Sequence, residues 1–128
     1  MLTRFLIYGL VGLLAEILWT GAHSLIKRDF TLKSETSVWM FFIYGSVILF
    51  EPLIHLTQTF PLLLRGTIYA LCIFTIEYLT GFLMKKLNIC PWDYSNAKFN
   101  INGIIRLDYA PAWFVLGLSF EFIYIQIL

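Results

Sequence analysis

The chain has 128 residues, of which 59% are apolar and only 13% are charged, against about 45–50% and about 25% in soluble domains. This composition, with only two cysteines, excludes a disordered tail, a basic nucleic-acid-binding protein, a disulfide-stabilised scaffold and an ordinary soluble enzyme. The length fits a single domain over residues 1–128. Because the formal net charge is only +1, the positions of the acids carry more information than their sum.

Four long apolar runs predict membrane-spanning helices, since a crossing takes about 20 apolar residues. They cover residues 5–26, 38–57, 62–84 and 112–128. The first run is too long for the apolar region of a signal peptide and carries Glu16 at its centre, so we expect it to be a span. The predicted fold class is therefore an all-α, multi-pass integral membrane protein with a small bundle of four transmembrane helices.

The distribution of lysine and arginine predicts how the chain is oriented in the membrane. The loops after the first and third runs contain seven bases, which are Lys27, Arg28, Lys33, Lys85, Lys86, Lys98 and Arg106. The opposite side has only Arg4 and Arg65. Since cytoplasmic loops are enriched in bases, we expect loops 27–37 and 85–111 to be cytoplasmic and both termini to face the other side.

The loop over residues 85–111 is the only long polar stretch of the chain. Asn102-Gly103 lies there between apolar residues, a pattern that predicts a short β-hairpin or a re-entrant turn at the membrane surface. Upstream lies the segment Trp92-Asp93-Tyr94-Ser95, in which Trp92 and Tyr94 are aromatic. This segment is expected to cap a turn, to form a polar lid over the bundle, or to join an interfacial aromatic belt. Lysines 85, 86 and 98 suit contact with anionic lipid headgroups.

Each predicted span contains one glutamate: Glu16, Glu51, Glu77 and Glu121. An acid at the centre of a membrane costs about 2.5–3.5 kcal/mol, so we expect these side chains to face one another, a polar cavity or a ligand. Helical spacing places small or polar residues on the same stripe as the acids. Those residues are Gly9, Gly12, Trp19 and His23; Tyr44 and His55; Gly66, Ala70 and either Thr80 or Gly81; and Trp113, Gly117 and Tyr124. Pro52, directly after Glu51, also leaves a backbone carbonyl one turn earlier without its donor.

Three functions are open for such a set of acids. The leading hypothesis is a binding or transport site in which the four glutamates bind a small cation, a proton or a polar lipid headgroup. Tyr44, His23, His55 and the Trp92–Ser95 segment would form its lid or surroundings. The second is a membrane enzyme acting on a lipid or isoprenoid, with a protonated glutamate as general acid and Asp93 or a histidine as its partner. The third is a structural subunit whose acids only hydrogen-bond between helices.

A metal site and a bound cofactor are not expected. Carboxylate-bridged di-metal bundles carry histidine three residues after two of their glutamates. Here His55 follows Glu51 by four residues and His23 follows Glu16 by seven. The sequence also shows no P-loop, glycine-rich phosphate motif or HExxH motif, so no cofactor is predicted.

Several segments together carry a family resemblance. They are Thr36-Ser37-Val38-Trp39, Pro61-Leu62-Leu63-Leu64-Arg65, Glu77-Tyr78-Leu79-Thr80-Gly81-Phe82, Cys90-Pro91-Trp92-Asp93-Tyr94-Ser95, Gly103-Ile104, Tyr109 and Trp113-Phe114. Over nearly its whole length the chain resembles the transmembrane protein 229 family and the related bacterial proteins described as putative type IV ABC-transporter permeases (CmpB-like). The resemblance implies a small multi-pass membrane protein, and its motif positions are Glu77, Gly81, Trp92, Asp93, Tyr94, Ser95 and Gly103.

The expected partners follow from the compartment and from this resemblance. Membrane lipids surround the chain, and no nucleic-acid partner is predicted. Because the sequence shows no nucleotide-binding motif, a transporter would need a partner ATPase, a second copy of the chain or another membrane subunit.

Overall fold

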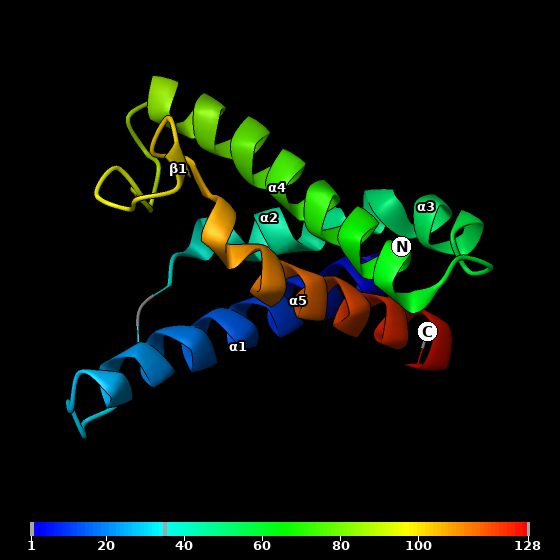
Figure 1. Ribbon diagram of the computed structural model, residues 1–128, viewed down its shortest axis with the longest axis horizontal. Coiled ribbons are helices and arrows are strands. Elements are labelled where there is room, and N and C mark those ends of the chain that lie inside the picture. Colours follow the sequence, from blue (N-terminus) through cyan, green and yellow to red (C-terminus); the bar gives the residue numbers. More distant parts are fainter. Residues whose placement is uncertain (1, 35, 128) are drawn as a thin grey trace. The chain divides into compact units, whose positions relative to one another are not determined.

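A computed structural model describes residues 2–34 and 36–127, without the side chain of Ile127. Residue 35 of the predicted first loop and residue 128 of the predicted fourth span lie outside the described residues. The elements in chain order are α1 (Leu2–Ile26), α2 (Val38–Gly45), η1 (Ser46–Phe50), α3 (Glu51–Leu56), α4 (Leu62–Lys86), β1 (Asn100–Ile101), β2 (Ile105–Arg106), η2 (Leu107–Tyr109), α5 (Ala110–Phe122) and η3 (Ile123–Ile127) (Figure 1). The chain divides into two compact units, Met1–Ile48 and Leu49–Leu128.

Three helical stretches are long and apolar enough to cross a membrane, namely Leu2–Ile26, Val38–Leu56 and Leu62–Lys86. They confirm three of the predicted spans. The fourth run forms α5, with 13 residues, and continues into η3, a π-helical segment of five residues. Since α5 alone is shorter than the roughly 20 residues that a crossing takes, a fourth span stays a prediction.

In the first unit, α1 and α2 approach closely at glycines that face aromatic rings. A Cβ atom added to Gly12 would lie 2.0 Å from Cγ of Tyr44, and one added to Gly45 would lie 2.6 Å from the Phe5 ring. Phe5 also meets Phe41 edge to face, with ring centroids 5.7 Å apart. In lipid the hydrophobic effect does not drive helices together, and small residues allow the close backbone approach on which van der Waals packing depends. These glycines therefore determine how closely the two helices pack.

The predicted span over residues 38–57 is one helical stretch with an irregular centre. Ser37 caps its start, because its Oγ accepts the backbone N–H of Trp39 at 3.3 Å. The α-helix then gives way to the 3₁₀ segment Ser46–Phe50 and resumes at Glu51. Pro52, at the start of α3, has no N–H to donate to the preceding turn. The proline therefore explains why α-helical geometry is interrupted just before it.

In the second unit, α4 and α5 lie side by side and run in opposite directions (Figure 1). A Cβ atom on Gly66 would lie 2.2 Å from the Phe114 ring, and one on Gly117 would lie 2.4 Å from Cβ of Tyr69. Each helix thus presents a glycine to an aromatic side chain of the other, and the two contacts bring both backbones close together.

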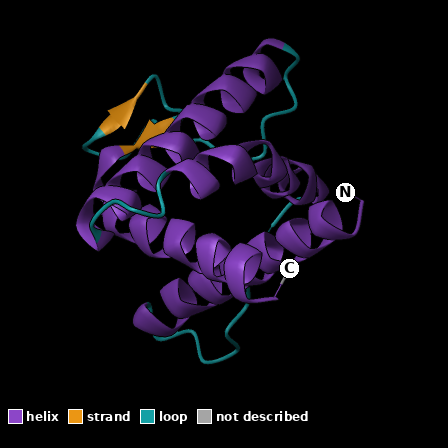
Figure 2. Cartoon of the chain, turned by 90° about the vertical axis from the view of Figure 1, so that its right-hand side faces the viewer, coloured by secondary structure: helices purple, strands orange, loops and turns teal. Residues whose placement is uncertain are grey.

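β1 and β2 form a two-stranded antiparallel sheet, drawn in orange in Figure 2. The sheet lies beside the C-terminal end of α4 (Figure 1). Asn102 and Gly103 form its turn with φ of 55° and 68°, and the N–H of Ile104 donates to the carbonyl of Ile101 at 3.0 Å. Positive φ at both central residues defines a type I′ turn, for which Asn-Gly is the preferred pair. The predicted hairpin is confirmed.

One side of this hairpin is anchored in a small apolar core. Ile104 and Ile105 are buried against Phe74 of α4, and Trp92 and Trp113 pack around them. The indole N–H of Trp92 also donates to the carbonyl of Ile104 at 2.8 Å. The loop is therefore a folded element attached to the end of the α4–α5 pair.

The glycines of α1 allow a matched test of the close approach in the first unit. Gly12→Ala should lower the free energy of unfolding, because overpacking costs about 1–3 kcal/mol and exceeds the gain in helix propensity of about 0.5–1 kcal/mol. Gly21→Ala is the control, since its added Cβ would lie no closer than 3.6 Å to Leu32 O. We expect the thermal midpoint in detergent to fall for the first variant and to hold or rise for the second. Equal stabilisation by both variants would contradict the packing described for α1 and α2.

Candidate functional site

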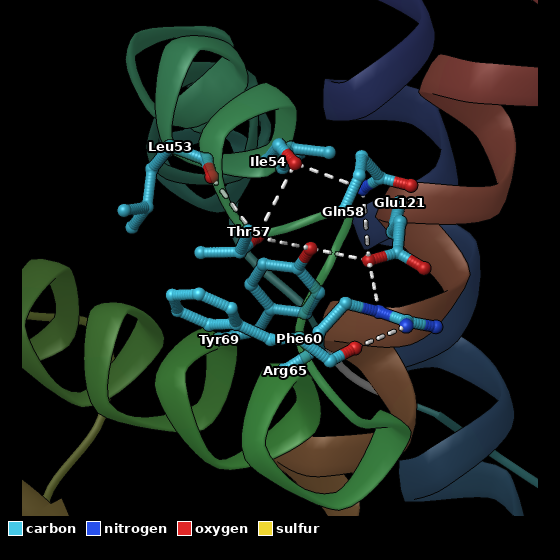
Figure 3. Close-up of polar contacts among 8 residues, drawn as sticks. All are labelled: Leu53, Ile54, Thr57, Gln58, Phe60, Arg65, Tyr69 and Glu121. Atoms are coloured by element: carbon cyan, nitrogen blue, oxygen red, sulfur yellow. Dashed lines mark hydrogen bonds and ion pairs between the residues drawn. The ribbon is translucent and has the colours of Figure 1, made fainter.

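A cluster of polar side chains around Glu121 connects α5 to α4 and to the turn that follows α3 (Figure 3). Nε of Arg65 lies 3.0 Å from Oε2 of Glu121 and forms an ion pair with it. The Tyr69 hydroxyl donates to the same oxygen, and Nε2 of Gln58 approaches it at 3.4 Å. The Glu121 carboxylate thus accepts three donors on one oxygen, one of them charged.

The helical repeat and a tight turn place these donors together. Arg65 and Tyr69 are four residues apart on α4, so their side chains share one face of the helix. Thr57 is buried with 3% exposure, and its Oγ1 lies 3.1 Å from the Tyr69 hydroxyl oxygen. Nη1 of Arg65 donates to the carbonyl of Phe60 at 2.8 Å. The guanidinium is therefore held at two points before any ligand arrives.

Two polar atoms of the cluster remain available. In the part of the chain that the structure describes, no hydrogen bond reaches Oε1 of Glu121 or Nη2 of Arg65. Figure 3 shows both atoms pointing to the same side, away from Tyr69 and Thr57. The side chains are 10% exposed for Glu121 and 20% for Arg65. The pair thus offers one acceptor and one donor to a group that carries the complementary atoms.

The other predicted glutamates lie in different surroundings. Glu51 at the start of α3 and Glu77 in α4 are buried, with 6% and 7% exposure, and both belong to the same unit as Glu121. Glu16 belongs to the first unit, where its Oε2 accepts the Tyr44 hydroxyl at 2.8 Å. The structure thus brings Tyr44 to Glu16. Convergence of all four acids on one centre stays a prediction.

The two predicted histidines are exposed. His23 contacts Trp19 edge to face, with ring centroids 5.0 Å apart, and His55 lies in the last turn of α3. Among the described residues, no group of three or more His, Cys, Asp or Glu side chains is placed to hold a metal ion.

The Trp92–Ser95 segment folds back onto the hairpin turn. The backbone N–H of Tyr94 donates to the carbonyl of Gly103 at 2.8 Å. Oδ1 of Asp93 accepts the backbone N–H of Ser95 at 3.0 Å and also its hydroxyl. Lys85 contacts both the Trp92–Ser95 segment and the hairpin turn. Its Nζ lies 3.7 Å from Oδ1 of Asp93 and donates to the Asn102 carbonyl at 3.3 Å. These contacts hold the loop to the last turn of α4.

A second ionic contact stabilises the end of the same loop. Nη2 of Arg106 lies 2.7 Å from Oδ2 of Asp108, and the guanidinium lies over the Tyr109 ring, 4.4 Å from its centroid. The hydrogen bonds from Arg106 lower the pKa of the Asp108 carboxyl. The hydrogen bonds from the Ser95 side chain and backbone likewise lower the pKa of Asp93.

The sequence-based prediction missed Arg65, Tyr69, Thr57 and Gln58. Arg65, which lies inside the predicted span 62–84, entered only the count of bases opposite the basic loops and the segment Pro61–Arg65 of the family resemblance, although an acid inside an apolar helix calls for a positive partner. In an antiparallel pair the first turns of one helix lie beside the last turns of the other, which places Arg65 near Glu121. That relation between α4 and α5 was the signal available in the sequence.

The apolar helices together with the half-buried ion pair define a multi-pass membrane protein that carries charged groups within its helices. Residues 3–128 match the family described as "Putative ABC-transporter type IV", and the chain belongs to that family. This match supports the resemblance to the permease-type proteins. It gives no support to the resemblance to the transmembrane protein 229 family. No solved structure matches the chain.

The contacts of Asp93 predict an acid-sensitive loop. Its pKa is lowered by bonds that exist only when the loop is folded, so they stabilise the loop at neutral pH and are lost as the pH falls below the ordinary carboxyl value of 3.8. Hydrogen exchange over residues 93–103, corrected for intrinsic rates, should accelerate in this range. Asp93→Asn should be less sensitive to acid than wild type, and the remaining change should come from Asp108. An identical acid response in the variant would contradict the role of Asp93.

Proposed function

We propose that this chain is the membrane component of a transport system and that its Arg65–Glu121 pair binds the headgroup of a zwitterionic aminophospholipid. One observation carries the proposal: an ion pair joins α4 and α5, with an oxygen of Glu121 and a nitrogen of Arg65 left open on the same side. An ammonium group can donate to that oxygen, and a phosphate can accept from that nitrogen. The headgroup of phosphatidylethanolamine carries both.

The position of the pair along the helix supports a headgroup as the ligand. Arg65 is the fourth residue of α4, so it lies about 5 Å from the start of the helix at about 1.5 Å per residue. The 25 residues of α4 extend over about 37 Å, which exceeds the hydrocarbon thickness of about 30 Å. The first turn of α4 is therefore expected at headgroup level.

The same geometry favours a zwitterion over a small cation. Arg65 already supplies the positive charge that balances Glu121, at 3.0 Å, so a metal ion would have to displace it. A zwitterion adds no net charge to the pair and leaves it intact. Glu51 and Glu77, which are buried in the same unit, are proposed as further carboxylates of the site.

Transport by this chain would require other components, because the sequence contains no P-loop. We propose that a partner ATPase or a second copy of the chain completes the system. In this proposal the loops 27–37 and 85–111 are cytoplasmic, α5 with η3 forms a fourth crossing, and the Arg65–Glu121 pair faces the opposite leaflet.

Lipid binding to the delipidated protein tests the headgroup site. Titrations followed by native mass spectrometry should show tighter binding of phosphatidylethanolamine than of phosphatidylcholine, whose quaternary ammonium has no N–H to donate. Glu121→Gln should weaken phosphatidylethanolamine binding by about ten- to a hundredfold, because hydrogen bonds to charged groups contribute about 1.5–3 kcal/mol. Arg65→Lys, which keeps the charge but loses the forked geometry, should weaken it less.

The matched control for this titration is Ser119→Ala. Ser119 lies two residues from Glu121 on α5, is exposed, and donates only to the carbonyl of Val115 in its own helix. It should bind lipid as the wild type does. Equal affinity for the two lipids, or an unchanged affinity in a folded Glu121→Gln protein, would overturn the proposal. A loss of thermal stability without any lipid preference would assign the pair a purely structural role.

A further inference from the structure

Lys86, the last residue of α4, and Lys98, in the loop before β1, each lie over an aromatic ring and have no acidic partner among the described residues. Nζ of Lys86 lies 4.6 Å from the centroid of the Phe82 ring, and Nζ of Lys98 lies 5.5 Å from that of Phe99. Throughout residues 2–34 and 36–127, no ion pair is formed by either lysine. Each ammonium group therefore lies against an apolar aromatic ring and carries a positive charge that no acid of the described chain neutralises.

The other charges of this loop compensate one another. Lys85 pairs with Asp93 at 3.7 Å, and Arg106 pairs with Asp108 at 2.7 Å. Of the four bases between residues 85 and 109, these two are balanced by the only two acids of the stretch. The charge of Lys86 and of Lys98 remains available for an external anion.

An apolar surface lies next to Lys98. Phe99 and Leu107 are 52% and 48% exposed, and the backbone N–H of Leu107 donates to the carbonyl of Phe99 at 3.1 Å, which makes the two residues neighbours. We call Lys98, Phe99 and Leu107 the hairpin edge. Ile104 and Ile105, in contrast, are buried in the core of the unit. The hairpin thus has one anchored side and one exposed edge with an apolar and a positive component.

From these contacts we propose that the hairpin edge and Lys86 dock on anionic phospholipids in the membrane interface, independently of the Arg65–Glu121 site. The partner follows from position and charge. α4 is a membrane-length helix that ends at Lys86, and the hairpin is tied to that end through Lys85. A lysine over an aromatic ring at a helix end suits an interface in which the ring enters the acyl boundary and the ammonium meets phosphate.

Hydrogen exchange of the full chain in lipid nanodiscs tests this docking. Nanodiscs of phosphatidylcholine alone are compared with nanodiscs of equal parts phosphatidylcholine and phosphatidylglycerol. Exchange over residues 97–108 should be slower in the anionic nanodiscs by roughly five- to twentyfold, since each base near an anionic surface contributes a factor of about five. High salt should remove the difference, because the charges are exposed and screened.

Two double variants separate docking from a general effect of charge. Lys86→Gln with Lys98→Gln should abolish the difference between the two nanodiscs while exchange in α4 and α5 stays unchanged. Lys27→Gln with Lys33→Gln removes the same charge from the exposed residues of the first loop and should leave the hairpin response intact. Equal exchange in both nanodiscs, or a full response without Lys86 and Lys98, would overturn the proposal. Because Arg65 and Glu121 are unchanged in both variants, the outcome does not depend on the headgroup site.

Discussion

The packing of α4 against α5 in the second unit depends on how the negative charge of Glu121 is neutralised within an apolar helix. Glu121 lies in α5 with a side chain only 10% exposed, and its counter-charge comes from Arg65 on α4 at 3.0 Å. Removing either partner would leave an uncompensated charge in low-dielectric surroundings, which is far more costly than the pair is stabilising. The contact therefore restricts the register of the two helices to arrangements that keep Arg65 beside Glu121.

The rest of the unit agrees with that register. Gly117 admits Tyr69 next to the ion pair, and Tyr69 donates its hydroxyl to Glu121. At the opposite end of α4 the polar contacts serve another purpose, because Lys85 and Asp93 fasten the hairpin to the last helical turn. Charge is thus concentrated at both ends of one long apolar helix. One end holds an ion pair that offers a donor and an acceptor, and the other carries lysines directed outward.

Features encoded by neighbouring residues could be predicted from the sequence, and those that depend on contacts between helices could not. The Asn102-Gly103 turn follows from the positive φ that this pair tolerates, and three membrane-length helices follow from hydropathy. The interruption before Glu51 follows from the missing N–H of Pro52. The partner of Glu121 was missed because Arg65 lies 56 residues away and no local pattern connects them. Likewise, no periodicity specifies that Glu16 meets Tyr44.

The most direct test of the account is a double-mutant cycle on the ion pair, measured as free energies of unfolding in a membrane-like environment. The cycle compares Arg65→Gln, Glu121→Gln and the double variant with the wild type. If Arg65 and Glu121 interact as the structure shows, the double variant is more stable than the sum of the single effects implies, with a coupling energy of about 1 kcal/mol or more. Additive effects, within about 0.3–0.5 kcal/mol, would show that Arg65 and Glu121 do not interact and would contradict both the register of α4 against α5 and the site built on it.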